Sequence, residues 1–439
     1  MKRKPIVILL CIFAVLSMGS SLVACNKINA DLLGEPKRAV ALSYEERLDG
    51  GFAAFKDNAE RFSAKLVASA YQDFSGEGNF ALSPVSVFFA LALASECASG
   101  DTRAELLSAL GVSYEQLQTN FPLLYRSLFV EQKNGSNIIN QINLTNSIWV
   151  DRSASVKREC IDTLADRYYT YSYAADFKND NSKANDAVRR FVKDKTNKLI
   201  DKDFKLSDNT LFAIINTLYL KTIWNYRGDV LPFTAQEYAF TATDGSVIHK
   251  KLLEGDHHAG RVYETQEYRA FYTLTYGGFK IKFMLPNQGY GIDDVFTESN
   301  IAAMNAITDF NEFDEENNIR YETRCIFPEF KCTYDGDLKN ILKDAFGINR
   351  LFIDPTTNAD GCSLSSLTDT QCFCDRIDHA VNLDVNKNGI EGAAATVIVG
   401  NTSLQPADVK RDFVIDRAFG FIITDANDVT LFSGVVKTI

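Results

Sequence analysis

The chain carries few residues in patterns that could perform catalysis. Its only histidines are His249, His257, His258 and His379, and no G-x-S-x-G, P-loop or H-E-x-x-H pattern is present. His257 and His258 lie in a polar stretch, which predicts a solvated loop. Three cysteines precede His379 without the spacing of a zinc site: Cys362, Cys372 and Cys374. The sequence therefore predicts a protein that is not an enzyme and uses no metal or cofactor.

Near the N-terminus, the residue whose setting predicts covalent chemistry is Cys25. Three cations, Lys2 to Lys4, precede the apolar stretch Ile6–Leu16, as in a secretory signal. Leu22–Cys25 then resembles the lipobox of bacterial lipoproteins, in which the chain is cut before a cysteine that becomes lipidated. The alternative is an ordinary secretory signal with an incidental cysteine. We expect residues 1–24 to be a signal peptide and the mature chain to be lipid-anchored in the bacterial cell envelope, at the outer membrane or cell surface.

The remaining composition describes an acidic globular domain behind a tether. The formal net charge is −11, and no basic run follows the first few residues, so we expect no nucleic-acid partner. Residues 25–48 are mostly polar and aperiodic, which predicts a flexible tether before a domain over residues 49–439. Seven cysteines remain after Cys11 and Cys25 are set aside, and an odd number cannot pair completely. A local disulfide and free buried thiols both remain open.

Helical patterns dominate the first half of the domain and strand patterns the second. The predicted helices are Gly51–Ala70, Ser83–Ala94, Thr102–Gly111 and Lys183–Leu199. The predicted strands lie in Ile138–Val150, Leu211–Leu220, Phe271–Pro286, Arg320–Tyr334 and Phe413–Val436. Helices and strands do not alternate regularly. This order predicts an α+β domain with antiparallel or mixed sheets.

One segment between two predicted strands has an unusual composition. Asn388–Ser403 reads NGIEGAAATVIVGNTS, with small and β-branched residues and Glu391 as its one charge. It has too little bulk for a normal core strand. Such a segment can lie exposed as a loop, and it can also enter a sheet as an extra strand, because small side chains do not overpack their neighbours. A plain surface loop is the alternative.

From about residue 50 to its end, the chain resembles the serpin family. Asn79–Gly111 resembles the family's N-S-P-x-S helix and the helix after it, and Leu211–Trp224 its N-A-x-Y-F-K-G-x-W segment. Phe327–Lys331 resembles its F-P-K-F strand, His379–Val385 its H-K-x-x-x-E-V strand, and Phe413–Ile423 its F-x-x-D-R-P-F signature. The resemblance implies a serpin-like α+β fold with about three sheets, eight or nine helices and an exposed reactive loop.

The family mechanism implies a single-use inhibitor of serine, and in part cysteine, endopeptidases. The target cleaves the loop, forms an acyl-enzyme and is trapped as the loop inserts into the central sheet. The resemblance assigns three groups of residues. The hinge is Gly389, Ile390, Glu391, Gly392, Ala393, Ala394, Ala395 and Thr396. The cluster beneath the opening sheet is Ser83, Ser86, Asn216 and His379. Trp224 packs where insertion begins.

The chain departs from the family pattern around the hinge. Ile390 replaces a small Thr or Ser, and a bulky side chain there could slow insertion unless it faces the core. Lys387 stands where the family has an acid, and Glu329 stands where that acid's lysine partner lies. We therefore predict an ion pair between Lys387 and Glu329 with its signs exchanged.

The position of the reactive bond and the target follow from counting along the loop. About fifteen residues from the hinge place the bond near Ser403–Leu404, within the wider range Val399 to Ala407. No Lys or Arg lies between Asn388 and Val409, which favours elastase-like, subtilisin-like or papain-like targets over trypsin-like ones. The expected partners are a covalently trapped endopeptidase and the membrane, with the protein a monomer. The alternative is a non-inhibitory surface lipoprotein that binds other molecules or is merely cleaved.

Overall fold

The computed structural model describes residues 28–134, 137–226, 230–307, 310, 313–314, 318–374, 376–390 and 407–439. Its helices are α1 (Tyr44–Arg47), α2 (Gly50–Asp73), α3 (Pro84–Cys97), α4 (Gly100–Leu110), α5 (Tyr114–Ser127), α6 (Arg158–Tyr168), α7 (Asn181–Lys195), α8 (Ile292–Val295), α9 (Glu298–Ala306) and α10 (Lys339–Phe346). In this part of the chain, no helix is long and apolar enough to cross a membrane.

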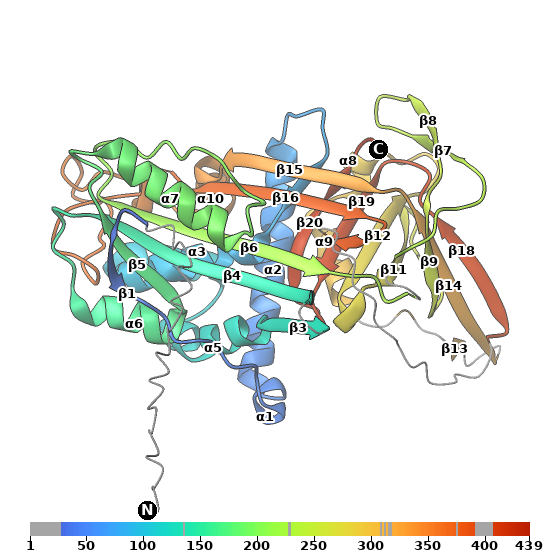
Figure 1. The fold of residues 1–439 in the computed structure, drawn as a ribbon, viewed down its shortest axis with the longest axis horizontal. Coiled ribbons are helices and arrows are strands. Elements are labelled where there is room, and N and C mark those ends of the chain that lie inside the picture. Colours follow the sequence, from blue (N-terminus) through green and yellow to red (C-terminus); the bar gives the residue numbers. More distant parts are fainter. Residues whose placement is uncertain are drawn as a thin grey trace, which may run out of the picture.

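Three larger sheets and one hairpin make up the strands (Figure 1). The central sheet has the order β1 (Asp31–Gly34), β5 (Thr170–Ala175), β4 (Asn137–Asp151), β6 (Phe212–Thr222), β17 (Gly389–Ile390), β16 (Asp378–Asn386) and β15 (Phe330–Asp337), with β3 (Val130–Asn134) beside β4. The second has β10 (Tyr263–Glu264), β11 (Tyr268–Leu274), β12 (Lys280–Pro286), β19 (Phe419–Thr424), β20 (Thr430–Val436) and β2 (Phe80–Leu82). The third joins β13 (Phe313–Asp314), β14 (Ile319–Phe327), β18 (Val409–Val414) and β9 (Leu253–Ala259), and the hairpin pairs β7 (Tyr238–Thr241) with β8 (Val247–Lys250). The predicted α+β class is confirmed.

The central sheet is covered on both faces. On one face α3 packs against β6, and its residues Phe88, Phe89 and Leu91 have no exposed surface. The helix is apolar around nearly its whole circumference, which suits a fully buried position. On the other face α7 packs Phe191 against Trp149 of β4 and Tyr173 of β5. Any strand added to this sheet therefore has one side facing the core beneath α3.

The segment expected to be a flexible tether differs from that expectation. From Asp31 it forms β1, which pairs antiparallel with β5 at the edge of the central sheet. Ala39 and Leu42 are buried against the domain. The sequence alone did not predict this packing, because β1 is only four residues long and contributes a partner strand rather than a core of its own.

Two predicted strand regions are divided more finely than the sequence indicated. Arg320–Tyr334 contains nearly all of β14 and the start of β15, which belong to different sheets. Pro328, between them, lacks the N–H that a continuous ladder needs. Phe413–Val436 spans three strands rather than two, because β18 pairs with β14 in parallel while β19 and β20 join the second sheet.

A carboxylate links the long helix α2 to strand β20. Glu60 Oε1 accepts a hydrogen bond from the Thr430 N–H at 2.9 Å, and its Oε2 accepts one from Thr430 Oγ1 at 2.6 Å. Burial raises the pKa of Glu60 to about 7, against the lowering effect of these hydrogen bonds. Between pH 4.5 and 7 the folded protein therefore binds a proton that the unfolded chain releases.

We expect Glu60→Gln to remove part of the loss of stability that occurs as the pH rises. Because the folded pKa lies above the ordinary one, stability falls between pH 4.5 and 7 and stays lowered above that range. Between pH 5 and pH 8 the free energy of unfolding of the parent should fall by about 3 kcal/mol more than that of the variant. Urea unfolding at both pH values measures this difference. Glu77→Gln, at an exposed position, is the control, and equal pH profiles for all three proteins would contradict the assignment.

Candidate functional site

The segment that follows β16 turns back and enters the central sheet. Gly389 pairs with Asn386, and Ile390 pairs with both Val385 of β16 and Thr222 of β6. The side chain of Ile390 is only 1% exposed and belongs to the main core. The bulk that could have obstructed insertion is therefore already accommodated at the first core-facing position. Among the described residues, no ladder joins β6 directly to β16. The two strands flank β17, and along the rest of their length their facing edges are not paired with each other.

Gly389 occupies a place that no other residue fits. Its φ is +128°, a backbone conformation that L side chains rarely adopt. A Cβ added there would lie 2.1 Å from the carbonyl oxygen of Thr222 and 2.9 Å from the Cα of Ile223. Gly389 is the glycine that the resemblance assigned to the hinge, and nothing in the sequence indicated that Thr222 would be its neighbour. That threonine is buried and donates from Oγ1 to Asn140 Oδ1 at 2.6 Å.

Trp224 supports the turn that precedes β17. Its indole Nε1–H donates to the carbonyl oxygen of Asn386 at 2.8 Å, and its ring meets Phe327 edge-on with centroids 5.6 Å apart. The ring itself is 1% exposed. This indole thus holds the end of β16 at the point where the chain reverses into the sheet, which is where the family resemblance places it.

Lys387 and Glu329 lie together, but not as the ion pair that was predicted. The main-chain N–H of Lys387, rather than its ammonium group, donates to Glu329 Oε1 at 2.9 Å. Within the described residues, no salt bridge joins the two side chains. Lys331 instead pairs with Asp384 at 2.7 Å, one step along the same two strands. Because Glu329 accepts this hydrogen bond from a main-chain N–H, it can stabilise the turn whichever side chain occupies position 387.

Three members of the cluster beneath the sheet lie together. Nε2 of His379, on β16, accepts the N–H of Ser83 at 3.1 Å. Ser83 Oγ and Ser86 Oγ are 3.0 Å apart. Ser83 stands at the start of α3, where the sequence predicted an N-cap, but its side chain makes no capping hydrogen bond. Burial lowers the pKa of His379 to about 4, so the ring is neutral and can accept that bond at physiological pH.

Asn216, the fourth member, is paired elsewhere. Its Nδ2 donates to Asn146 Oδ1 across the β4–β6 ladder. Its own Oδ1 is buried and, in the part of the chain that the structure describes, has no hydrogen-bond partner. A buried acceptor of this kind carries a desolvation cost until a donor arrives.

Other predicted residues lie outside the described part of the chain. These are Glu391, Gly392, Ala393, Ala394, Ala395 and Thr396 of the hinge, Ser403 and Leu404 at the predicted reactive bond, and Cys25.

The histidine pair and the cysteines differ from a catalytic arrangement. His257 and His258 lie in β9 rather than in a solvated loop. His258 Nε2 accepts the N–H of Leu274 at 3.3 Å, and burial lowers the pKa of His258 to about 4. The seven described cysteines are free thiols: Cys97, Cys160, Cys325, Cys332, Cys362, Cys372 and Cys374. Within the described residues, no group of His, Cys, Asp or Glu side chains could hold a metal ion.

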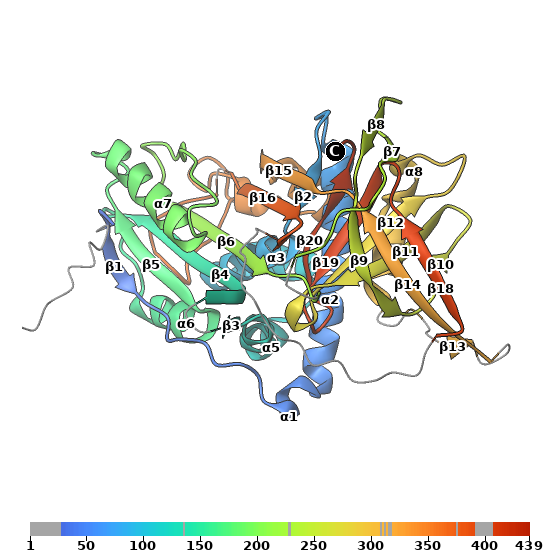
Figure 2. The same ribbon diagram turned by 45° about the vertical axis from the view of Figure 1, so that its right-hand side comes forward.

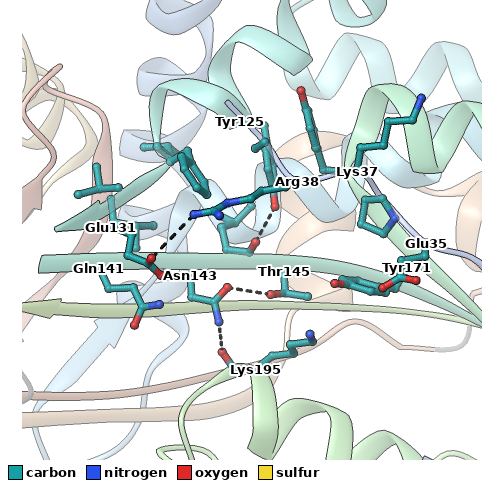
Figure 3. Close-up of a pocket in the computed structure, with 18 residues that line it drawn as sticks. Glu35, Lys37, Arg38, Tyr125, Glu131, Gln141, Asn143, Thr145, Tyr171 and Lys195 are labelled. Carbon is teal, nitrogen blue, oxygen red and sulfur yellow. Dashed lines mark hydrogen bonds and ion pairs between the residues drawn. The ribbon is translucent and has the colours of Figure 1, made fainter. Parts of the chain in front are cut away.

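A cavity of about 520 Å³ lies away from the hinge, between the segment after β1 and strand β4 (Figure 3). Arg38 reaches toward Glu131 at 3.8 Å, and Asn143 donates to the carbonyl oxygen of Lys195 at 2.8 Å. The ammonium group of Lys195 lies 4.7 Å from the centre of the Tyr171 ring. These groups could hold a small anionic or aromatic molecule, but none is arranged as a nucleophile with its base.

The three sheets and the helices that cover them define a mixed α+β fold, which the comparisons with known proteins assign to a family. The family model described as "Serpin (serine protease inhibitor)" matches residues 57–438. The chain belongs to the serpin family, whose members are generally protease inhibitors. A curated relative, Serpin-ZXA of Oryza sativa subsp. japonica, is 26% identical over 400 residues, which cover 86% of this chain and 94% of the relative.

Solved structures agree with this fold. The native state of tengpin, a thermophilic serpin, matches with a TM-score of 0.70 and 20% identity, covering 94% of this chain and all of that one. Thyroxine-binding globulin in complex with thyroxine matches with a TM-score of 0.67 and 19% identity, covering 88% and 99% of the two chains. At these identities the likeness concerns the fold alone.

Proposed function

We propose that this serpin is a single-use inhibitor that traps its target by inserting a cleaved loop into the central sheet. The observation that carries the proposal is β17, whose Ile390 is paired on both sides and buried between β6 and β16. Insertion thus needs only to extend a strand that has begun. The small residues after Ile390 suit such an extension.

The register of β17 specifies how the extension would run. Continuing the pairing of Ile390 with Thr222 and Val385 sets position 394 between Leu218 and Val381, which are both buried. Because side chains alternate between the two faces of a strand, Gly392, Ala394 and Thr396 would face the core. Glu391, the one charge in the hinge, would face outward.

The same register brings the hinge to the cluster beneath the sheet. Position 396 falls between Asn216 of β6 and His379 of β16. The hydroxyl of Thr396 could then donate to Asn216 Oδ1, the buried acceptor that lacks a partner among the described residues. Satisfying this acceptor would favour the inserted state over the native one.

The chemistry would be supplied by the target. The protease's nucleophile attacks the carbonyl carbon of the reactive bond, an acyl bond forms, and the C–N bond breaks as the new amine takes a proton. Insertion of about fifteen residues at about 3.3 Å each would then carry the acylated protease some 50 Å. We infer a reactive bond at Ser403–Leu404, within Val399–Ala407, and elastase-like, subtilisin-like or papain-like targets, because that stretch lacks Lys and Arg.

A gel experiment tests the trapping directly. We expect residues 28–439, incubated with an elastase-like protease, to give a covalent complex that survives denaturing electrophoresis, with protease activity lost in a near one-to-one titration. Trypsin should give little complex, since no Lys or Arg is available in the loop. Cleaved serpin with fully active protease from every protease class would exclude trapping.

A second candidate function is a serpin-fold lipoprotein that binds a small molecule instead of inhibiting. The cavity between Arg38, Lys195 and strand β4 favours it, and a solved neighbour carries thyroxine. The gel experiment separates the two, because a binding module would be cleaved without retaining the protease. In either case we propose anchoring in the bacterial cell envelope by lipid at Cys25, with the signal in residues 1–24 and the protein a monomer.

A further inference from the structure

Strongly exposed apolar side chains gather in the first described segment of the chain. Val40 is 70% exposed, Tyr44 72% and Leu48 66%, and Leu32 of β1 is 50% exposed. Elsewhere in the described residues, Val247 is the one large apolar side chain above 50%. Single exposed apolar residues are ordinary, whereas such a gathering marks an interaction surface. We call Val40, Tyr44 and Leu48 the apolar edge.

The backbone that carries the apolar edge is held firmly. Arg126 of α5 donates to the carbonyl oxygens of Val40 and Ala41, and its guanidinium pairs with Glu46 at 2.7 Å. Between Val40 and Tyr44, Leu42 turns inward and is buried. Ser43 caps α1 by accepting the N–H of Glu46 at 3.2 Å. The exposure is therefore a property of an ordered surface.

We propose that the apolar edge rests in the interfacial layer of the bilayer that anchors the chain. This rests on the proposed lipid anchor at Cys25. Leu32 lies seven positions after Cys25, a span of at most about 25 Å. An anchored chain is thereby held with its first ordered segment beside the lipid. No other large surface could reach this segment as consistently as the membrane to which it is tied.

The composition of the apolar edge suits an uncharged interface. Tyrosine favours the boundary between headgroups and acyl chains, while Leu and Val favour the apolar side. Residues 31–48 contain three cations and four acids, so attraction to anionic lipids adds little. Contact should accordingly be equal on zwitterionic and anionic vesicles.

Such contact would also orient the protein. The segment after β1 runs along the lower edge of the molecule to α1 (Figure 2). β1 and β18 lie at opposite ends of the long axis (Figure 1). A bilayer along the lower edge would thus fix which side of the molecule faces the membrane.

Fluorescence quenching tests the contact. Tyr44→Trp is introduced into the full lipidated chain, which is bound to phosphatidylcholine vesicles with or without brominated acyl chains. The native Trp149 and Trp224 are 0% and 1% exposed and should respond little. We expect at least twofold quenching of Tyr44→Trp by the brominated lipid. Val247→Trp, at a 54% exposed site on β8, should show none.

Three results would overturn the proposal, each in its own way. Bound Tyr44→Trp protein quenched no more than Val247→Trp would show that the apolar edge does not touch lipid. If Tyr44→Trp were shielded from aqueous acrylamide but not quenched by brominated lipid, and the protein formed a concentration-dependent dimer, the apolar edge would contact a second copy of the chain instead of lipid. Failure of the parent chain to float with vesicles, as Cys25→Ser should fail, would remove anchor and contact together while leaving the gel experiment on trapping unaffected.

Discussion

Replacing Ala394 by arginine is expected to convert the inhibitor into a substrate that the protease cleaves and leaves. If insertion continued the register set by Ile390, Thr222 and Val385, position 394 would face the core between Leu218 and Val381. Leaving a charge there without a partner costs about 3–5 kcal/mol. Insertion should slow by two to three orders of magnitude, since each 1.4 kcal/mol is about tenfold. Hydrolysis of the acyl-enzyme should then be faster than insertion, so the protease is released.

The matched control uses the same substitution one residue earlier. Ala393→Arg would take the opposite face, between Tyr219, which is buried, and Asn382, which is exposed, and should retain more of the inhibition than Ala394→Arg. The measurement is the ratio of covalent complex to cleaved serpin on a denaturing gel, with loss of protease activity as a second readout. Equal inhibition by both arginine variants would rule out insertion in this register. Complete loss in both would mean that any charge in the hinge blocks insertion, whichever face it takes.

Gly389→Ala is expected to weaken the native state and the trap at once. The added Cβ would lie 2.1 Å from the Thr222 carbonyl oxygen, at a φ of +128° that alanine adopts only with strain. Overpacking of this kind costs about 1–3 kcal/mol, and the strained backbone about 1–3 kcal/mol more. The chain must either bear this cost or withdraw β17 from between β6 and β16.

The two outcomes are separated by measuring stability and inhibition together. A lower urea midpoint with inhibition partly kept indicates that β17 stays in the sheet under strain. A smaller midpoint shift with more cleaved serpin per complex indicates that β17 has been expelled. Gly50→Ala is the control, because an added Cβ there meets nothing within 4 Å, and it should match the parent protein. A parent-like Gly389→Ala variant would mean that β17 is not inserted in solution.

A few residues hold the turn between β16 and β17. Trp224 holds the carbonyl oxygen of Asn386, Glu329 holds the N–H of Lys387, and Gly389 lets the chain reverse against Thr222. Each contact uses main-chain groups and therefore tolerates changes in the neighbouring side chains. This explains how Lys387 can replace an acid without disturbing the turn.

Much of the molecule was predictable because local patterns and motif order survive in the sequence. The periodicity of α2 and α3, the apolar run of β6 and the turn after β11 were each recognised within a few residues of their observed bounds. The hinge at Gly389–Thr396 was predicted for a similar reason, since its small-residue composition differs from that of an ordinary core strand, and it stays a prediction. These features depend on residues close together in the chain.

What only the tertiary structure decided concerns residues far apart in the chain. The sequence could not show that Ile390 lies buried between Thr222 and Val385, that Asn216 Oδ1 lacks a partner among the described residues, or that Lys387 meets Glu329 through its N–H. Nor could it show that the supposed tether pairs with β5. Each depends on which strand edge is free and which face is covered, and these are set by packing across hundreds of residues rather than by local spacing. The sequence itself determined the serpin family of the chain and predicted a hinge at Gly389–Thr396; the fold decided that Ile390 occupies the sheet between β6 and β16.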